Sequence, residues 1–250
     1  MQHTDRKNPF VNREPLVAGG RSTFMQRVRT ALGRERGEKV IPPAPPAHDD
    51  AVIRQVRAGD PGIVDRWATY ATGNGMKVAR VKLAEPATIQ NAIDGFFADH
   101  KITRVILNAR EFEAKLPLVM HLSAKGIETH KWGDHDCSNT AFTCEASITD
   151  ARAGLADTGS LLVWSDKTFG RATTLVTPVH VVLLPASRIL PDLIDGLALV
   201  AQENNITAPG GMPSNVVVIN GPSKTADIEM NLVTGVHGPK YLYILLLDDA

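Results

Sequence analysis

A ten-residue stretch from Asn220 to Glu229 carries side chains suited to binding an anion. It follows an apolar run, Val216 to Ile219, and apolar residues recur at helical spacing after it. We therefore predict a buried strand, a Gly-Pro turn and a helix whose first turn is rich in hydroxyl groups. In an α/β protein, such a junction exposes backbone N–H groups and the positive end of a helix dipole at the carboxyl edge of the sheet, where anions bind. The predicted anion-binding residues are Gly221, Pro222, Ser223, Lys224, Thr225 and Asp227.

A second candidate is the stretch Gly154–Ser160, which precedes another apolar run. Gly159 permits a tight turn and the close approach of a ligand, and Thr158 and Ser160 supply hydroxyl groups. This pattern predicts a loop that grips a carboxylate, a phosphate or a thioester-type group, with Asp157 as orienting group or base. Both stretches also have a plainer interpretation. The first is then a capped helix start without a ligand, and the second is a hairpin turn, which its local sequence favours.

Two further residues complete the predicted catalytic set of Asp157, Glu145 and His237. Glu145 lies in β-like sequence, and if buried its carboxylate needs a partner or a raised pKa. His237 lies between two glycines at the end of the predicted helix, where it could carry a proton. Capping of the helix carbonyls is the default interpretation of His237. We interpret His180, in a predicted strand, as a hydrogen-bonded structural residue.

The sequence disfavours several other classes of site. Asp134-His135-Asp136 is a weak metal signal, so we predict a solvated loop and no metal site. Cys137 and Cys144 are too few for a zinc or iron–sulfur site, and we expect two unlinked thiols and no cofactor bound by this chain. Walker and Gly-x-Gly-x-x-Gly patterns are absent from the sequence. Because no apolar run approaches membrane-spanning length and no signal region follows Met1, we expect a cytoplasmic protein.

Composition and charge predict one large α/β domain with an N-terminal arm. The chain has 250 residues, 43% of them hydrophobic, and its 27 basic residues match its 27 acidic ones. Residues 22–36 predict a basic amphipathic helix that docks on the domain or on a neighbouring subunit, rather than on nucleic acid or a membrane. The Pro-rich run from Ile41 to Ala47 predicts a semi-rigid linker. We therefore place the arm at residues 1–49 and the α/β domain at residues 50–250.

Strands and helices alternate after the linker. This predicts a three-layer α/β fold, with a parallel-dominated mixed sheet flanked by helices. From residue 155 the strands follow one another closely, which predicts an antiparallel or mixed portion. The predicted strands are 77–83, 104–107, 127–132, 144–148, 161–164, 175–176, 179–184, 216–219 and 241–247. The predicted helices are about 51–72 with a Gly-Pro interruption, one from residue 86, one near 117, 191–203, and one after residue 225.

Several motifs follow one another along the domain. They are Glu145-Ala-Ser-Ile-Thr149, Gly154-Leu-Ala-Asp-Thr-Gly-Ser160, Pro178-Val-His180, Leu184-Pro-Ala-Ser-Arg188, Gly221-Pro-Ser-Lys-Thr-Ala-Asp-Ile-Glu229 and Gly235-Val-His-Gly-Pro239. In this order, over roughly residues 50–250, they resemble the LUD-domain family. With the basic helix and the Pro-rich linker, the chain most resembles the short LutC type, also called YkgG.

This resemblance implies a fold like that of the sugar-phosphate isomerases and CoA transferases, the NagB/RpiA/CoA-transferase-like fold. It also implies a part in the bacterial oxidation of L-lactate to pyruvate, alongside iron–sulfur partner proteins. Long LUD relatives carry a Cys-rich ferredoxin-like region, and this chain has only two cysteines. Electron transfer must therefore use cofactors outside this polypeptide.

Three functional hypotheses follow. The first is a LutC-like subunit of a lactate-oxidising complex, whose pocket binds a small carboxylate or another anionic group between the 157–160 loop, the 221–225 junction, Glu145 and His237. The second is a stand-alone isomerase or acyl-transfer enzyme acting on a phosphosugar or a CoA ester. The third is a non-catalytic scaffold whose basic helix docks on a partner. The first two require residues 157–160 and 221–225 to converge on one cleft, and the sequence leaves the oligomeric state open.

Overall fold

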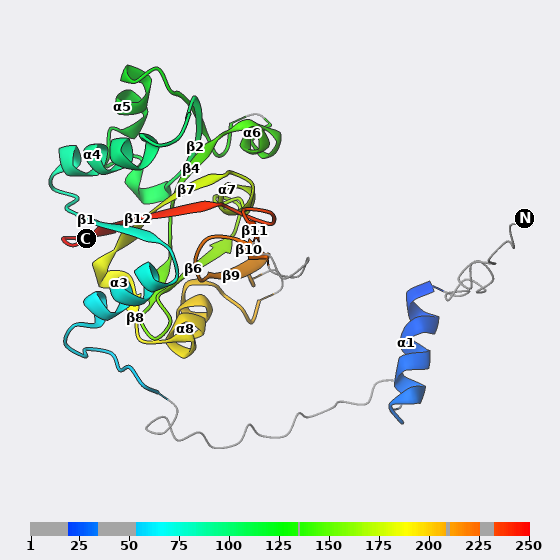
Figure 1. Ribbon diagram of the computed structural model, residues 1–250. Coiled ribbons are helices and arrows are strands. Elements are labelled where there is room, and N and C mark those ends of the chain that lie inside the picture. Colours follow the sequence, from blue (N-terminus) through cyan, green and yellow to red (C-terminus); the bar gives the residue numbers. More distant parts are fainter. Residues whose placement is uncertain (1–19, 35–53, 135, 209–210, 226–232) are drawn as a thin grey trace, which may run out of the picture. The chain divides into compact units, whose positions relative to one another are not determined.

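The structure, a computed structural model, describes residues 20–34, 54–134, 136–208, 211–225 and 233–250. The chain divides into two compact units, residues 1–49 and residues 50–250. In the first unit the helix α1 spans Gly20–Ala31 (Figure 1). It ends earlier than the predicted 22–36 because Gly33, with a φ of 65°, adopts the left-handed conformation that terminates helices.

A six-stranded parallel sheet forms the centre of the second unit (Figure 1). Its strands lie in the order β1-β12-β7-β4-β2-β3, and every neighbouring pair is parallel. Their bounds are β1 Lys77–Val81, β2 Arg104–Asn108, β3 Glu128–Lys131, β4 Ala146–Asp150, β7 Val179–Pro185 and β12 Tyr241–Leu247. The three central strands are buried on both faces almost throughout, as expected where both faces of a sheet are covered. The predicted parallel-dominated sheet is confirmed.

One face of this sheet is covered by α4 (Pro86–Phe97) and α5 (Leu118–Ala124). Pro86 suits the first turn of α4, where its missing N–H would have no helical partner. The buried residues of α4 recur every four positions and form one apolar stripe: Ile89, Ile93 and Phe97. This stripe packs against the side chains that β2, β4, β7 and β12 direct to the same face.

The other face is covered by α3 (Ile63–Gly73) and by a second sheet. This second sheet has the order β8-β5-β6-β9, with β6 antiparallel to both β5 and β9. The bounds are β5 Ala153–Leu155, β6 Ser160–Ser165, β8 Ile189–Leu190 and β9 Asn215–Ile219. The buried Trp67 of α3 joins the layers, since its Nε1 donates to the carbonyl of Ser160 at 2.9 Å. Among the closely spaced strands predicted after residue 155, the antiparallel or mixed portion is thus confirmed only for β6, because the predicted strand 179–184 is β7 of the parallel sheet.

Next to the second sheet lies α8 (Leu193–Glu203), which matches its predicted range closely. Asp192 caps this helix, and its Oδ1 accepts hydrogen bonds from the N–H groups of Ile194 and Asp195 at 2.9 and 3.1 Å. In the described ranges, no helix is long and apolar enough to cross a membrane.

The predicted helix start at residues 223–225 is wrong. Lys224–Thr225 is a short strand, β10, paired antiparallel with β11 (Val233–Thr234). This pairing, with hydrogen bonds between Ser223, Gly235 and Pro239, places Lys224 and Thr225 in a strand rather than in the first turn of a helix. Residues 226–232, which include the candidate Asp227, lie outside the described residues. Because β9 belongs to the second sheet, the junction is also not at the carboxyl edge of the parallel sheet.

Other local differences have similar causes. The predicted strand at Leu175-Val176 is instead part of α7 (Ala172–Leu175), where the Thr173 and Thr174 hydroxyls bond to the carbonyls of Gly170 and Arg171. The loop around Asp136 leads into α6 (Cys137–Thr143), which the sequence did not predict. The predicted helix 51–72 begins at Ile63 in the described chain, after turns at Gly59 and Gly62. Two short 3₁₀ helices are η1 (Arg110–Phe112) and η2 (Ala186–Arg188).

Candidate functional site

The two loops singled out in the sequence do converge, at the end of α3. Asn74 Nδ2 donates to the carbonyl of Thr158 at 2.8 Å and to Asn220 Oδ1 at 2.6 Å. Ser160 Oγ lies 2.8 Å from Thr158 Oγ1 and 3.1 Å from Asn220 Oδ1. Lys224 Nζ donates to the carbonyl of Asn74 at 3.3 Å. The hydrogen-bonding groups of both loops therefore engage one another, and their binding of an anion stays a prediction.

Glycines allow these loops to lie against the end of α3. A Cβ on Gly159 would lie 2.3 Å from the backbone nitrogen of Ala71, and one on Gly221 would lie 2.6 Å from the carbonyl oxygen of Asn74. Both glycines also have positive φ, 69° and 113°. The sequence suggested that Gly159 lets a ligand come close. In the structure, the glycine instead lets the loop backbone lie against the backbone at the end of α3. Pro222 packs in the same place, beside Gly75.

The predicted catalytic residues lie in three different settings. Asp157 Oδ1 accepts a hydrogen bond from Thr158 Oγ1 at 3.1 Å. His237 is exposed and follows β11 rather than a helix, with its backbone N–H 3.2 Å from Ser223 Oγ. Glu145 lies at the amino end of β4, where its Oε2 accepts from the N–H of Arg104 at 2.7 Å and of Thr103 at 3.1 Å. Burial raises the pKa of Glu145, but these N–H groups outweigh it and lower that pKa below its ordinary value. Its carboxylate is thus ionised and holds β2 to β4.

A different cluster lies at the carboxyl ends of β2 and β4, which are neighbours in the parallel sheet. The chain leaves β2 through η1 toward α5 on one face, and it leaves β4 into the second sheet on the other face. In open α/β sheets, ligands bind at such a switch point, outside the carboxyl ends of two strands whose connections diverge. The fold therefore directs attention to the residues that follow these two strands.

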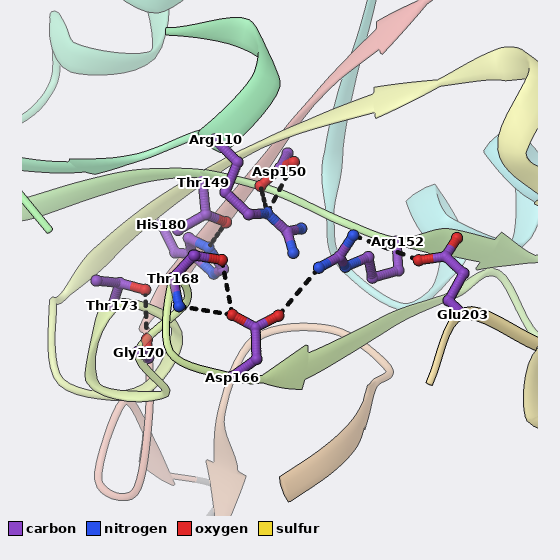
Figure 2. A network of polar contacts seen from close by, with 10 residues as sticks. All are labelled: Arg110, Thr149, Asp150, Arg152, Asp166, Thr168, Gly170, Thr173, His180 and Glu203. Atoms are coloured by element: carbon purple, nitrogen blue, oxygen red, sulfur yellow. Dashed lines mark hydrogen bonds and ion pairs between the residues drawn. The ribbon is translucent and has the colours of Figure 1, made fainter. Parts of the chain in front are cut away.

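Arg110 follows β2, and its guanidinium pairs with Asp150 at the end of β4 (Figure 2). The Nε of Arg110 lies 2.8 Å from Oδ1 and 3.1 Å from Oδ2 of Asp150, and the side chains are only 12% and 2% exposed. In the described part of the chain, Nη1 and Nη2 of Arg110 are buried and have no hydrogen-bond partner. Arg110 also has a φ of 37°, which is uncommon for a residue with a side chain and is often found at functional sites.

Arg152, two residues after β4, is the second cation of the cluster. Its Nη2 lies 3.1 Å from Asp166 Oδ2 and its Nη1 lies 3.4 Å from Glu203 Oε2. Its guanidinium lies 4.8 Å from the ring of Trp164. Asp166 is itself held in place, since its Oδ1 accepts from the N–H and the Oγ1 of Thr168, both at 2.7 Å. Ion pairs and ring stacking thus fix the orientation of Arg152.

The guanidinium groups of Arg110 and Arg152 face each other in Figure 2. Their charges and their burial shift the pKa values of the cluster. Burial lowers the pKa of Arg152, and the positive charge of Arg110 lowers it further. Burial also raises the pKa of Asp150, which Arg110 opposes. In a site shielded from water, two facing cations with unused donors favour an anion, and an arginine can bind a carboxylate through two parallel hydrogen bonds.

Residues of the turn at 166–170 pack around the guanidinium of Arg110. The ring of Phe169 lies 4.5 Å from the guanidinium carbon of Arg110. The side-chain amide of Asn108, in the orientation that satisfies both of its groups, donates to the carbonyl of Thr168 at 3.1 Å and accepts from the N–H of Gly170 at 3.2 Å. Thr173 Oγ1 donates to the carbonyl of Gly170 at 2.7 Å. The end of β2 therefore fixes the turn that covers Arg110.

Two cavities adjoin this turn. One of about 320 Å³ is lined by Trp132, Phe169 and Arg171, among others, and one of about 440 Å³ by Lys167 and Met212. Both cavities are also lined by the same three residues, Ser165, Asp166 and Ser214. Asp166 thus contacts open space on two sides while it holds Arg152, and Phe169 contacts both the smaller cavity and Arg110.

His180 lies behind the cluster, as Figure 2 shows, and is fully buried. Its Nε2 lies 2.8 Å from Thr149 Oγ1, and its Nδ1 has no partner among the described residues. Burial lowers the pKa of His180 to about 3, so its imidazole is neutral in the folded protein. The expected structural role of His180 agrees with its hydrogen bond to Thr149.

This buried histidine predicts a specific pH dependence. Below pH 6.5 the unfolded chain protonates His180 and the folded chain does not, so stability falls as the pH drops from 6.5 toward 3. We expect a loss from this group of about 2 kcal/mol between pH 6.5 and pH 5. Urea unfolding of the wild type and of His180→Gln across this range will measure it, because the variant should show a slope smaller by up to one proton. His237→Gln, at an exposed position, should keep the wild-type slope, and equal slopes for His180→Gln and the wild type would contradict the prediction.

In the described part of the chain, no group of three His, Cys, Asp or Glu side chains is placed to hold a metal ion. Cys137 and Cys144 are free, and burial raises the pKa of the Cys144 thiol to about 11. Cys144 is therefore protonated at neutral pH and is a poor nucleophile.

The arginine cluster was not predicted from the sequence, although a signal was present. β2 ends at Asn108 and is followed by Ala109 and Arg110, and β4 ends at Asp150 and is followed by Ala151 and Arg152. Each strand thus has the same pattern at its end, a polar residue, an alanine and an arginine. If the two strands are neighbours in the sheet, this pattern places both arginines at one sheet edge. That they are neighbours is a property of the fold, because η1, α5, β3 and α6 separate them in the chain.

Comparison with known proteins places this fold in a family. Residues 64–247 match the LUD domain. Lactate utilization protein C of Bacillus subtilis (strain 168) is 27% identical over 236 residues, which cover 90% of this chain and 95% of that protein. The protein of the same name from Halalkalibacterium halodurans is 28% identical over 235 residues, 92% of this chain and 98% of its own length.

A solved structure supports the fold alone. The crystal structure of a DUF162 family protein from Deinococcus radiodurans matches with a TM-score of 0.52 and 17% identity, over 74% of this chain and 96% of that one. Because the LUD domain match covers most of the sequence, including both sheets and the helices that enclose them, this chain belongs to the LUD domain family.

Proposed function

We propose that this chain takes part in lactate utilization and that Arg110 and Arg152 bind the carboxylate of lactate or of pyruvate. The observation that carries the proposal is the pair of buried nitrogens, Nη1 and Nη2 of Arg110, which have no partner in the described chain. Leaving such donors unpaired is costly, and a carboxylate satisfies two of them at once. The relatives named lactate utilization protein C, matched over nearly their full length, support this class of ligand.

The residues around Arg110 suit a carboxylate in one orientation. Asp150 holds the Nε edge of the guanidinium, so the two Nη atoms are left for the ligand. Phe169 covers one face of the guanidinium and limits the access of water, which strengthens the ion pair. Neither Arg110 nor Arg152 lines the cavity of about 320 Å³, but Phe169, which contacts Arg110, and Asp166, which holds Arg152, both line it, so the rest of the ligand would extend into that cavity.

Oxidation of a 2-hydroxy acid removes a hydride equivalent and a proton. Asp166 is the carboxylate of the cluster that lines the cavities and would receive the proton, although its lowered pKa makes it a weak base. Burial raises its pKa, but the hydrogen bonds from Thr168 and the charge of Arg152 outweigh this and keep the pKa below its ordinary value, so the carboxylate is ionised. The two electrons of the hydride equivalent would pass one at a time to iron–sulfur proteins of a lactate-oxidation system, and its proton would be released to water. The two cysteines of this chain are fewer than an iron–sulfur cluster needs.

Calorimetric titration of the full chain with L-lactate, pyruvate and lactamide tests the proposal. Lactamide keeps the shape of lactate and lacks its charge. We expect saturable binding of both carboxylates and at least tenfold weaker binding of lactamide. Equal binding of lactate and lactamide would contradict the role of the arginines. A response to ribose 5-phosphate or acetyl-CoA, with none to lactate or pyruvate, would instead favour a stand-alone isomerase or acyl-transfer enzyme.

A further inference from the structure

The charge of the cluster limits the charge of its ligand. Five charged side chains form two groups of ion pairs there: Arg110 with Asp150, and Arg152 with Asp166 and Glu203. Two positive and three negative charges give a net charge of −1. The guanidinium groups of the site can therefore donate hydrogen bonds to a ligand, while the net charge of the surrounding cluster is slightly negative.

Asp166 is the carboxylate that an incoming ligand would meet. Its side chain lines both cavities, whereas the side chain of Asp150 is only 2% exposed and lies behind Arg110. Asp166 also cannot easily turn away, because the backbone and hydroxyl of Thr168 and the guanidinium of Arg152 hold both of its oxygens. Glu203 reaches Arg152 from α8 on the side opposite Asp166 and adds a second negative charge.

Two further cations, Lys167 and Arg171, line the cavities at their rim. Both are exposed, whereas the side chains of Arg110 and Arg152 are 12% and 21% exposed, so water and salt screen the rim cations more than the two arginines of the cluster. Asp166 itself is 32% exposed, so the incoming ligand reaches its carboxylate from the cavities. A ligand with one negative charge can be paired with Arg110, and a second negative charge on the same ligand would lie near Asp166 without a buried cation to pair it.

We propose that Asp166, assisted by Glu203, makes this site selective for ligands with a single negative charge. This inference rests on the proposed function and deepens it, because it separates a monocarboxylate such as lactate from dicarboxylates and phosphoesters. Discrimination arises from repulsion of the wrong ligand as well as from attraction of the right one.

Titration of the full chain at pH 8 with L-lactate and with malonate, which carries two charges at that pH, tests the inference. We expect the wild type to bind L-lactate at least tenfold more tightly than malonate. Asp166→Asn should reduce this ratio at least fivefold, since the amide oxygen can still accept from Thr168 while the charge is gone. Glu203→Gln should change the ratio in the same direction without altering the 166–170 turn.

A matched control is Asp60→Asn, since Asp60 also accepts a backbone hydrogen bond in a turn, from Arg57 at 2.8 Å. This variant should keep the wild-type ratio. Malonate bound as tightly as lactate by the wild type, or ratios unchanged in both Asp166→Asn and Glu203→Gln, would overturn the inference while leaving carboxylate binding intact. Binding of neither ligand would instead overturn the proposed function, and this inference with it.

Discussion

Replacement of Gly159 by alanine is expected to destabilise the domain by about 4 kcal/mol or more, because the packed interior leaves no room for the added methyl group. The new Cβ would lie 2.3 Å from the backbone nitrogen and 2.5 Å from the carbonyl carbon at the junction of Ala71 and Tyr70. Backbone atoms of a helix cannot move aside as a flexible side chain can. The 157–160 loop would have to separate from α3, which would also strain the hydrogen bond between Trp67 and Ser160. Chemical denaturation of the purified variant will measure the change.

Gly126→Ala is the matched control for this substitution. Gly126 has a φ of 76°, close to the 69° of Gly159, and a Cβ there would meet nothing within 4 Å. It therefore isolates the cost of the left-handed backbone, about 1–2 kcal/mol. Similar losses for the two variants would mean that the close packing of the loop on α3 contributes nothing.

Replacement of Arg110 by methionine is expected to cost about 3–5 kcal/mol and to abolish carboxylate binding. It would leave Asp150, which is 2% exposed, as a buried charge without its partner. The double variant Arg110→Met/Asp150→Asn should recover most of this stability, because it removes the unpaired charge as well. It should not recover binding. Denaturation and calorimetric titration of the two variants will separate the effects.

Arg80→Met provides the comparison for a pair near the surface. Arg80 bonds to Asp65 and Asp248, and its own side chain is 49% exposed. Exposed pairs contribute about 0–1 kcal/mol, so this variant should lose little stability and keep the wild-type affinity for lactate. A loss as large as that of Arg110→Met would indicate a general sensitivity to arginine removal, and binding retained by Arg110→Met would contradict the proposed site.

The elements that could be predicted were those with local causes. β12 agrees with its predicted range because seven residues from Tyr241 to Leu247 form an uninterrupted apolar run. α4 begins at Pro86 as predicted, because proline suits a first turn. Residues 157–160 and 221–225 were expected to converge on one cleft. The two loops do meet, through contacts of Asn74 with Thr158, Asn220 and Lys224, and the sequence did not single out Asn74.

The elements and site residues that were not predicted depend on contacts between residues that are distant in the sequence. Lys224 and Thr225 pair with Val233 and Thr234, and no local pattern reveals such a pairing. Arg110 is an ordinary arginine in the sequence, and its importance comes from burial beneath Phe169 and contact with Asp150, 40 residues away. The burial of a charged group is decided by tertiary packing, so the chemistry of this cluster became visible only with the fold.

The division of the cluster between two layers has a thermodynamic consequence. Arg110 follows β2 of the parallel sheet, in η1, and Asp166 belongs to the turn after β6 of the second sheet. A ligand bound to both residues would link the two layers, and neither layer could unfold alone without releasing the ligand. Ligand at a hundred times its dissociation constant would then raise the free energy of global unfolding by about 2.7 kcal/mol. The stability of the protein would therefore depend on the concentration of its ligand.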